Sequence, residues 1–145
     1  MPTPTLNGQV LGEAERATRA VLDRVLARYG LTFHDWVVLN ITGAGPVERD
    51  RLVARMTSAL KIDEVAVLEA ITELTGRGLI EAGPSGEAAQ VTLTDAGRAR
   101  HGQIRATVDE ITSRLYGDLP ADDLATAGRV LTVLTARANA ELDRV

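Results

Sequence analysis

The apolar residues of this chain recur at a helical spacing along almost its whole length, and only one short segment changes that period. Over about residues 8–28, 33–42, 48–60 and 63–77 they return every three or four positions, as the buried face of an amphipathic helix requires. Residues 78–82 and 90–93 instead suit two strands, and the Gly, Pro and Ser residues between them predict a turn. Two further helices are predicted, from about Asp95 to Leu115 and from about Pro120 onward.

The residues at the ends of these segments are ones that start or stop helices. Thr32 suits the N-cap of the second helix, and Asp35 would complete a short capping box with it. Asp63 and Thr94 are predicted N-caps of the fourth and fifth helices, and Gly30 is a predicted stop of the first. The predicted boundaries therefore have local chemical support.

Three helices followed by a two-stranded hairpin form the element order of a winged helix-turn-helix. The sequence therefore predicts a mainly α chain with a small β-hairpin, built as a single domain over residues 1–145. That length lies in the range of about 100–200 residues that is typical of one domain. We expect the winged helix-turn-helix at about residues 47–94. We expect dimerisation helices on both sides of it, at about residues 8–30 and 95–145.

The side chains present exclude several kinds of chemistry. The chain has no cysteine, so it holds no disulfide, thiolate zinc site or cysteine nucleophile. His34 and His101 are its only histidines, and their spacing does not support a metal site. GxSxG, HExxH, P-loop and GxGxxG motifs are all absent from the sequence. We therefore expect no enzymatic activity, no catalytic residues, no cofactor and no metal.

The sequence also bears on location. The first residues carry neither the basic nor the apolar region of a signal peptide, and no run of 18 apolar residues occurs. We therefore expect a cytoplasmic protein that has no membrane partner.

Three short motifs resemble those of MarR-type transcriptional regulators. Residues 31–39, LTFHDWVVL, resemble the family's "LTxxQWxVL" second helix, and residues 74–80, LTGRGLI, resemble its "LexrGLv" entry into the wing. Residues 91–97, VTLTDAG, resemble the "vxLTekG" exit from the wing. The motifs follow the family's order near its spacings, and the resemblance covers essentially the whole chain.

The resemblance implies a function as well as a fold. It implies an intertwined homodimer held together by the first, fifth and sixth helices. It implies that the fourth helix enters the major groove of double-stranded DNA and that the wing tip reaches the minor groove. It also implies a pocket for a small aromatic or phenolic ligand between the dimerisation and DNA-binding regions. The main hypothesis is therefore a ligand-responsive, DNA-binding transcriptional regulator.

The distribution of charge conflicts with DNA binding. The net charge of the chain is −4, and residues 62–90 alone hold six acidic residues and one arginine, a local net charge of −5. If the fourth helix buries Val67, Ala70, Ile71 and Leu74, its outward positions are Asp63, Ala66, Glu69, Thr72 and Glu73. DNA is a polyanion whose affinity for proteins comes largely from Lys and Arg. A second hypothesis is therefore a pseudo-regulator that has lost DNA binding and serves as a small-molecule-binding or partner protein, and less readily as an enzyme.

Candidate DNA-binding residues are basic or hydroxyl side chains on or near the third helix and at the entry to the wing. Lysine and arginine neutralise phosphates, and hydroxyl groups donate to them. The alternative for each arginine is a solvated helix face or an ion pair within its own helix. The candidates are Arg49, Arg51, Arg55, Thr57, Ser58, Lys61 and Arg77.

Candidate ligand-binding residues include three of the chain's four aromatic side chains, which crowd into eight positions of the sequence. Aromatic walls with a few polar groups are typical of small-molecule pockets. The alternative is ordinary core packing, above all for Trp36. The candidates are Tyr29, Phe33, His34, Trp36, His101 and Arg105.

Overall fold

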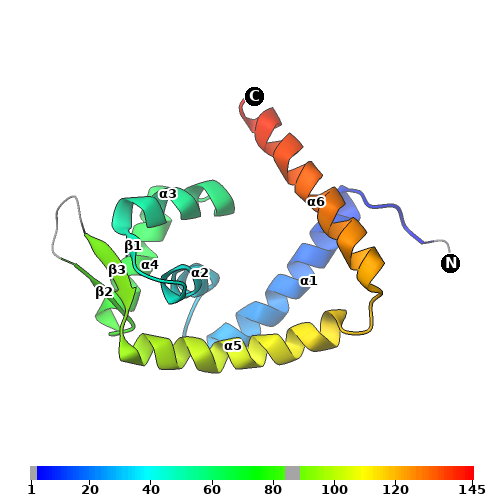
Figure 1. The fold of residues 1–145 in the computed structure, drawn as a ribbon. Helices are drawn as coiled ribbons and strands as arrows, with labels where there is room; N and C mark the ends of the chain where they lie inside the picture. The colour runs from blue at the N-terminus through cyan, green and yellow to red at the C-terminus, as the bar shows by residue number, and fades with distance from the viewer. Residues whose placement is uncertain (1–2, 84–88) are drawn as a thin grey trace. The chain divides into compact units, whose positions relative to one another are not determined.

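A computed structural model describes residues 3–83 and 89–145 of the chain, drawn as a ribbon in Figure 1. Its contacts divide the chain into two compact units, Met1–Val108 and Asp109–Val145. The first unit holds every element up to the first part of α5, and the second holds the rest of α5 together with α6. The elements are α1 (Gly8–Ala27), α2 (Phe33–Gly43), β1 (Val47–Glu48), α3 (Arg49–Leu60), α4 (Glu64–Gly76), β2 (Ile80–Ala82), β3 (Gln90–Leu93), α5 (Asp95–Tyr116) and α6 (Ala121–Leu142).

The predicted order of helices and hairpin strands is confirmed, with one strand added. β2 and β3 pair antiparallel, with Ile80 opposite Leu93, as a hairpin requires. β1 pairs with the other edge of β3 through Val47 opposite Val91, so the sheet has the order β1-β3-β2. The sequence does not predict β1 because two residues are too few to show an alternating pattern. As a consequence, α3 begins at Arg49 rather than at Glu48.

The predicted helix caps form as expected. The Thr32 side chain accepts from the backbone N–H of Asp35, and the Asp35 carboxylate accepts from that of Thr32, so the capping box is complete. Asp63 accepts from Ala66 N at 2.9 Å, which caps α4. The Thr94 hydroxyl accepts from Gly97 N at 2.9 Å at the start of α5. Each cap satisfies backbone N–H groups that a helix terminus leaves unpaired.

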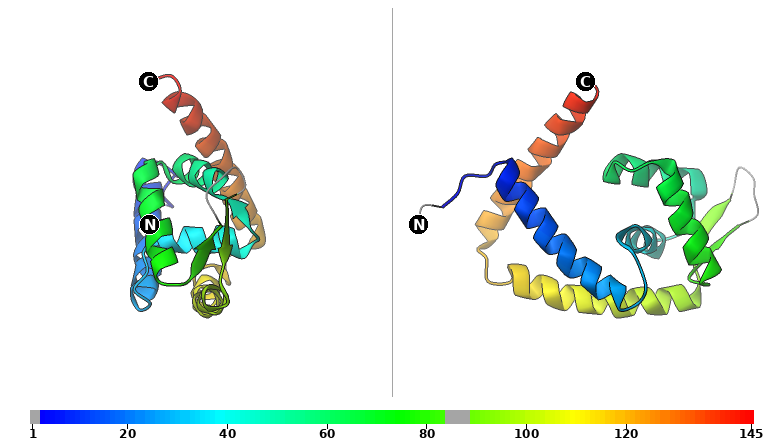
Figure 2. Two further views of the ribbon diagram at one scale, coloured as in Figure 1. Left: turned by 90° about the vertical axis from the view of Figure 1, so that its left-hand side faces the viewer. Right: turned by 180° about the vertical axis from the view of Figure 1, so that it is seen from behind.

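The core of the first unit surrounds α2, which contacts α1, α3, α4 and β3 (Figures 1 and 2). Val67, Ala70, Ile71 and Leu74 of α4 are all buried, as their spacing predicts. Leu39 of α2 and Leu52 of α3 are fully buried with them. Burying a side chain of this kind contributes about 1.5–3 kcal/mol to folding, so these contacts hold α3 and α4 in a helix-turn-helix arrangement.

The second unit buries none of its apolar side chains in the single chain. Every residue from Asp109 to Val145 is exposed or half-buried. The exposed large apolar residues of this unit are Leu115, Tyr116, Leu119, Leu124, Val130, Val133, Leu134, Leu142 and Val145. The apolar surface of this unit is therefore unpartnered in a single chain.

In the described parts of the chain, no helix is both long and apolar enough to cross a membrane.

Gly97 allows the start of α5 to lie directly against the residue before β2. It is buried, and a Cβ atom built there would overlap the carbonyl oxygen of Leu79. The same carbonyl accepts from Thr94 N at 3.1 Å, so this backbone is already held in place from the α5 side. Any side chain at position 97 must therefore push the wing and α5 apart.

We expect Gly97→Ala to lower the free energy of unfolding by about 2–4 kcal/mol, because backbone rather than a flexible side chain occupies the space. Gly102→Ala is a matched control on the same helix, because a Cβ there meets nothing within 4 Å. The control should raise the free energy of unfolding by about 0.5–1 kcal/mol. Urea denaturation followed by circular dichroism measures both values, and equal effects would contradict this account of Gly97.

Candidate functional site

A cavity of about 540 Å³ lies between α1, the first turn of α2 and α4, within the first unit. Its volume is within the range of about 300–1,000 Å³ that small-molecule sites occupy. Apolar and charged side chains both line it. The lining comprises Arg19 and Asp23 of α1, Leu31, Thr32, Phe33, His34 and Asp35 at the start of α2, and Ala66, Glu69, Ala70 and Glu73 of α4.

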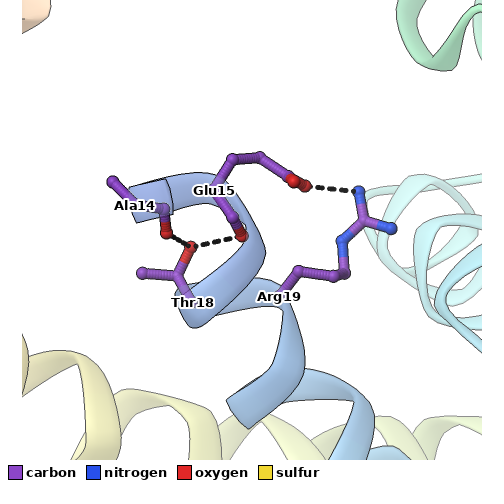
Figure 3. Close-up of polar contacts among 4 residues, drawn as sticks. All are labelled: Ala14, Glu15, Thr18 and Arg19. Carbon is purple, nitrogen blue, oxygen red and sulfur yellow. Dashed lines mark hydrogen bonds and ion pairs between the residues drawn. The ribbon is translucent and has the colours of Figure 1, made fainter. Parts of the chain in front are cut away.

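Arg19 lines the cavity from α1, and its guanidinium stacks on an aromatic ring. Its guanidinium carbon lies 3.3 Å from the centroid of the Phe33 ring, in cation–π contact. Its Nη2 atom lies 3.2 Å from Oε1 of Glu15, one turn earlier on α1. Figure 3 shows the side chains of Arg19 and Glu15 meeting on one side of the helix. The Thr18 hydroxyl instead donates back to the Ala14 carbonyl. Arg19 is thus held by two partners, Glu15 of α1 and Phe33 of α2.

The carboxylates of the cavity have fewer partners. Asp23, Glu69 and Glu73 are exposed, and no ion pair joins them to any residue in the described ranges. Asp35 is only 1% exposed, and its Oδ2 accepts from Thr32 N at 2.9 Å. Its Oδ1 is buried and has no hydrogen-bond partner among the described residues. A buried polar atom without a partner is costly, so this oxygen is an unusual feature of the lining.

The six residues predicted to line a ligand pocket do not all lie at one site in the structure. Phe33 and His34 line the cavity. Trp36 is buried, and its ring centroid lies 5.2 Å from that of His101 on α5. Tyr29 lies under the guanidinium of Arg100 at 5.3 Å, and Arg105 is exposed on α5. Of the predicted residues, therefore, only Phe33 and His34 belong to the cavity, and Trp36 packs in the core against α5.

Trp36 and His101 form a second cluster, between α2 and α5. Nε2 of His101 lies 2.8 Å from Oδ1 of Asn40, so the imidazole is anchored to α2. Burial lowers the pKa of His101 below its usual value of 6.5, and the positive charge of Arg105 lowers it further. His101 therefore favours the neutral form in the folded protein. Among the described residues, no group of histidine and carboxylate side chains is arranged to hold a metal ion.

We expect NMR titration to place the pKa of His101 below 6.5. Because the folded state binds its proton less readily, this group stabilises the fold fully above pH 6.5, and the contribution is lost as the pH falls below that value. Arg105→Gln should raise the pKa of His101, whereas Arg100→Gln on the same helix should leave it unchanged. A pKa that both substitutions shift equally, or that neither shifts, would contradict the assigned causes.

The predicted DNA-binding residues lie mostly on α3. Arg49, Arg51, Arg55 and Ser58 are exposed on this helix. The half-buried Thr57 donates its hydroxyl to the Ala54 carbonyl at 3.1 Å. Lys61 ends the helix in the left-handed conformation, with φ of 57°. Six of the seven candidates are thus brought together on one element and its C-cap.

Arg77 differs from the other candidates because it holds two parts of the first unit together. Its Nη1 donates to the Gly30 carbonyl at 2.6 Å, and its Nη2 donates to the Tyr29 carbonyl at 2.8 Å. These carbonyls follow the end of α1, where helix geometry leaves acceptors unpaired. The sequence gives no sign of this contact, because 47 residues separate Arg77 from Gly30.

We expect Arg77→Ala to lower the free energy of unfolding by about 1–2 kcal/mol, since two charge-assisted hydrogen bonds are lost in a partly solvated place. Arg51→Ala, on the exposed face of α3, should change it by less than about 0.5 kcal/mol. Thermal unfolding by calorimetry compares the two variants. An Arg77→Ala protein as stable as Arg51→Ala would show that the contact with the end of α1 contributes nothing.

Some of the outward residues predicted for α4 line the cavity, and others lie outside its lining. Ala66, Glu69 and Glu73 line the cavity that faces α1 and α2. Val65, which is 61% exposed, and Thr72 lie exposed outside that lining. Val65 is not among the outward residues predicted from the sequence. The predicted wing tip at residues 84–88 lies outside the described residues.

Comparisons with solved structures identify the fold. Rv2887, a MarR-family protein of Mycobacterium tuberculosis in complex with p-aminosalicylic acid, is 22% identical over 90% of this chain and 99% of its own, with a TM-score of 0.69. BpsR of Bordetella bronchiseptica, whose DNA binding is regulated by 6-hydroxynicotinic acid, is 22% identical over 93% and 98%, with a TM-score of 0.72. A mutant MarR of E. coli in complex with operator DNA is 22% identical over 88% and 91%, with a TM-score of 0.71.

The fold is of the MarR type. The match spans the winged helix-turn-helix and the helices on both sides of it, in agreement with the resemblance of the three sequence motifs. No protein-family model matches the sequence, and a comparison with curated proteins finds no match. The similarity to MarR-type structures therefore concerns the fold, and function rests on the chain's own residues.

Proposed function

We propose that this protein is a transcriptional regulator that binds double-stranded DNA as a homodimer and responds to a small ligand. The single observation that carries the proposal is the group of exposed arginines on α3 of a winged helix-turn-helix, in which Arg51 and Arg55 lie one turn apart on the same face and Arg49 begins the helix. In such a motif the first helix crosses the DNA backbone while the second enters the major groove. Arginines on α3 would then contact phosphates, and Val65 and Thr72 of α4 would face the bases.

The exposed surface of α4 carries both acidic and neutral residues. Glu69 and Glu73 line the cavity on the side of α4 that faces α1 and α2. The part of α4 outside the lining includes the neutral residues Val65 and Thr72. Glu69 lies one helical turn from both of these residues, so entry of this face into a groove depends on the arginines of α3 to offset the carboxylate.

The homodimer is proposed from the unpartnered apolar side chains of the second unit. Val130, Val133 and Leu134 are each more than two-fifths exposed, at 41%, 44% and 41%. Apolar surface removed from water contributes about 25 cal/mol per Å², and exposed patches of this kind mark interaction sites. A second copy of the same helices would cover them. We propose that α1, α5 and α6 supply this interface.

One observation favours the alternative of a pseudo-regulator that binds a small molecule or a partner protein. Neither α4 nor the described strands of the wing carry a lysine or arginine, and Glu64 and Glu81 are exposed there. Under this alternative the arginines of α3 are simply solvated. The two functions differ in whether the chain binds duplex DNA at all.

A salt titration of binding to a random-sequence duplex separates these functions. We expect fluorescence anisotropy to show binding at about 50 mM salt, with log K falling linearly as log salt rises. Arg55→Ala should weaken binding to all sequences and reduce the slope by about one, because one phosphate contact is lost. Arg28→Ala, at an exposed position just after α1, is the matched control and should bind as the unmodified protein does. Absence of binding at about 50 mM salt would refute DNA binding and leave the pseudo-regulator.

A further inference from the structure

The lining of the cavity between α1, α2 and α4 is strongly acidic. It contains one guanidinium, that of Arg19, and the four carboxylates of Asp23, Asp35, Glu69 and Glu73, a formal net charge of −3. The carboxylates come from three different elements, α1, α2 and α4, so tertiary structure brings them to one place.

Arg19 does not neutralise these carboxylates. Its guanidinium is paired with Glu15, which is not part of the lining, and stacked on Phe33. Asp23, Glu69 and Glu73 have no ion pair with any described residue. The negative charge of the cavity is therefore left without a cation from this part of the chain.

The carboxylate of Asp35 is an independent sign of a missing partner. Asp35 lines the cavity and is only 1% exposed, yet its Oδ1 has no hydrogen-bond donor among the described residues. Buried carboxylate oxygens normally accept hydrogen bonds, because an unpaired one has lost water without replacement. A ligand that carries N–H donors and a positive charge would supply what this oxygen lacks.

We propose that this cavity binds a planar organic cation, of the amidinium or guanidinium class, attached to a small apolar ring. Planar N–H donors match carboxylates in paired hydrogen bonds, which favours this class over a compact ammonium. Leu31, Ala66 and Ala70 supply an apolar wall for the ring. The contact of Arg19 with Phe33 at 3.3 Å is an example, within the structure, of a planar cation stacked on an aromatic side chain of the lining.

This inference deepens the proposed function, because it rests on the chain being ligand-responsive and names the class of ligand. The family resemblance implies a small aromatic or phenolic ligand, and this inference assigns a positive charge to it. An acid would place its carboxylate among four others, and like charges at close range repel.

Benzamidinium, benzamide and benzoate test the proposal, because they share one shape and differ in charge. Titration calorimetry with the full chain and no DNA should show benzamidinium binding at least about tenfold more tightly than either benzamide or benzoate. NMR spectra should show that benzamidinium shifts the resonances of Phe33 and His34. Benzoate or benzamide binding as tightly as benzamidinium, or no binding of benzamidinium at all, would overturn the proposal.

Variants locate the charge that is responsible. The double substitution Glu69→Gln with Glu73→Gln should weaken benzamidinium binding by at least about tenfold and leave benzamide binding unchanged. Glu64→Gln is the matched control, because Glu64 lies on the same helix outside the lining. Equal losses in the control and the double variant would refute a site in this cavity. Circular dichroism checks that each variant is folded.

Benzamidinium binding and DNA binding test different claims, so the two titrations can give different outcomes. A chain that binds duplex DNA but not benzamidinium contradicts only this inference. A chain that binds benzamidinium but not DNA keeps the ligand site and contradicts the proposed regulator.

Discussion

The buried carboxylate of Asp35 holds the first turn of α2 in place, and both side-chain clusters of the first unit depend on that turn. Thr32 N donates to Asp35 Oδ2 at 2.9 Å, and Asp35 N donates to the Thr32 hydroxyl at 3.2 Å. This reciprocal cap fixes where α2 begins. Phe33 and His34 then line the cavity, whereas Trp36 packs in the core against His101 of α5. One capping box therefore sets the geometry on both sides of α2.

The same turn connects the cavity to the helix proposed to read DNA. Glu69 and Glu73 of α4 share the cavity with Asp35, so a ligand there would contact α4 directly. Arg77, just after α4, is bonded to the carbonyls of Tyr29 and Gly30 that lead into α2. The cavity lining and the Arg77 contacts thus both join α4 to the start of α2. A ligand can act on DNA binding only if it favours one position of α4 over another.

The sequence predicted the order of elements and their caps because these depend on neighbours three or four residues apart. The buried face of α4 and the capping box of α2 are examples. It could not predict β1, whose two residues carry no period, or the bonds of Arg77, whose partners lie 47 and 48 residues away.

The site was predicted only in part for the same reason. Sequence proximity grouped Phe33 with Trp36, and residues three apart are indeed neighbours on a helix surface. Tertiary packing nevertheless places Phe33 at the cavity and Trp36 against His101 of α5, which local spacing does not indicate. From the sequence, the acidic residues of α4 are predicted to oppose DNA binding. Their place beside Asp23 and Asp35 depends on tertiary packing, and no local pattern in the sequence indicates it.

The central claim is that two copies of this chain act together on duplex DNA. The mass of the complex tests it most directly. Sedimentation of the chain with a labelled duplex at low salt should give the mass of the duplex plus two chains of 15.5 kDa each. A complex that contains one chain, or a chain and duplex that sediment separately, would contradict the account.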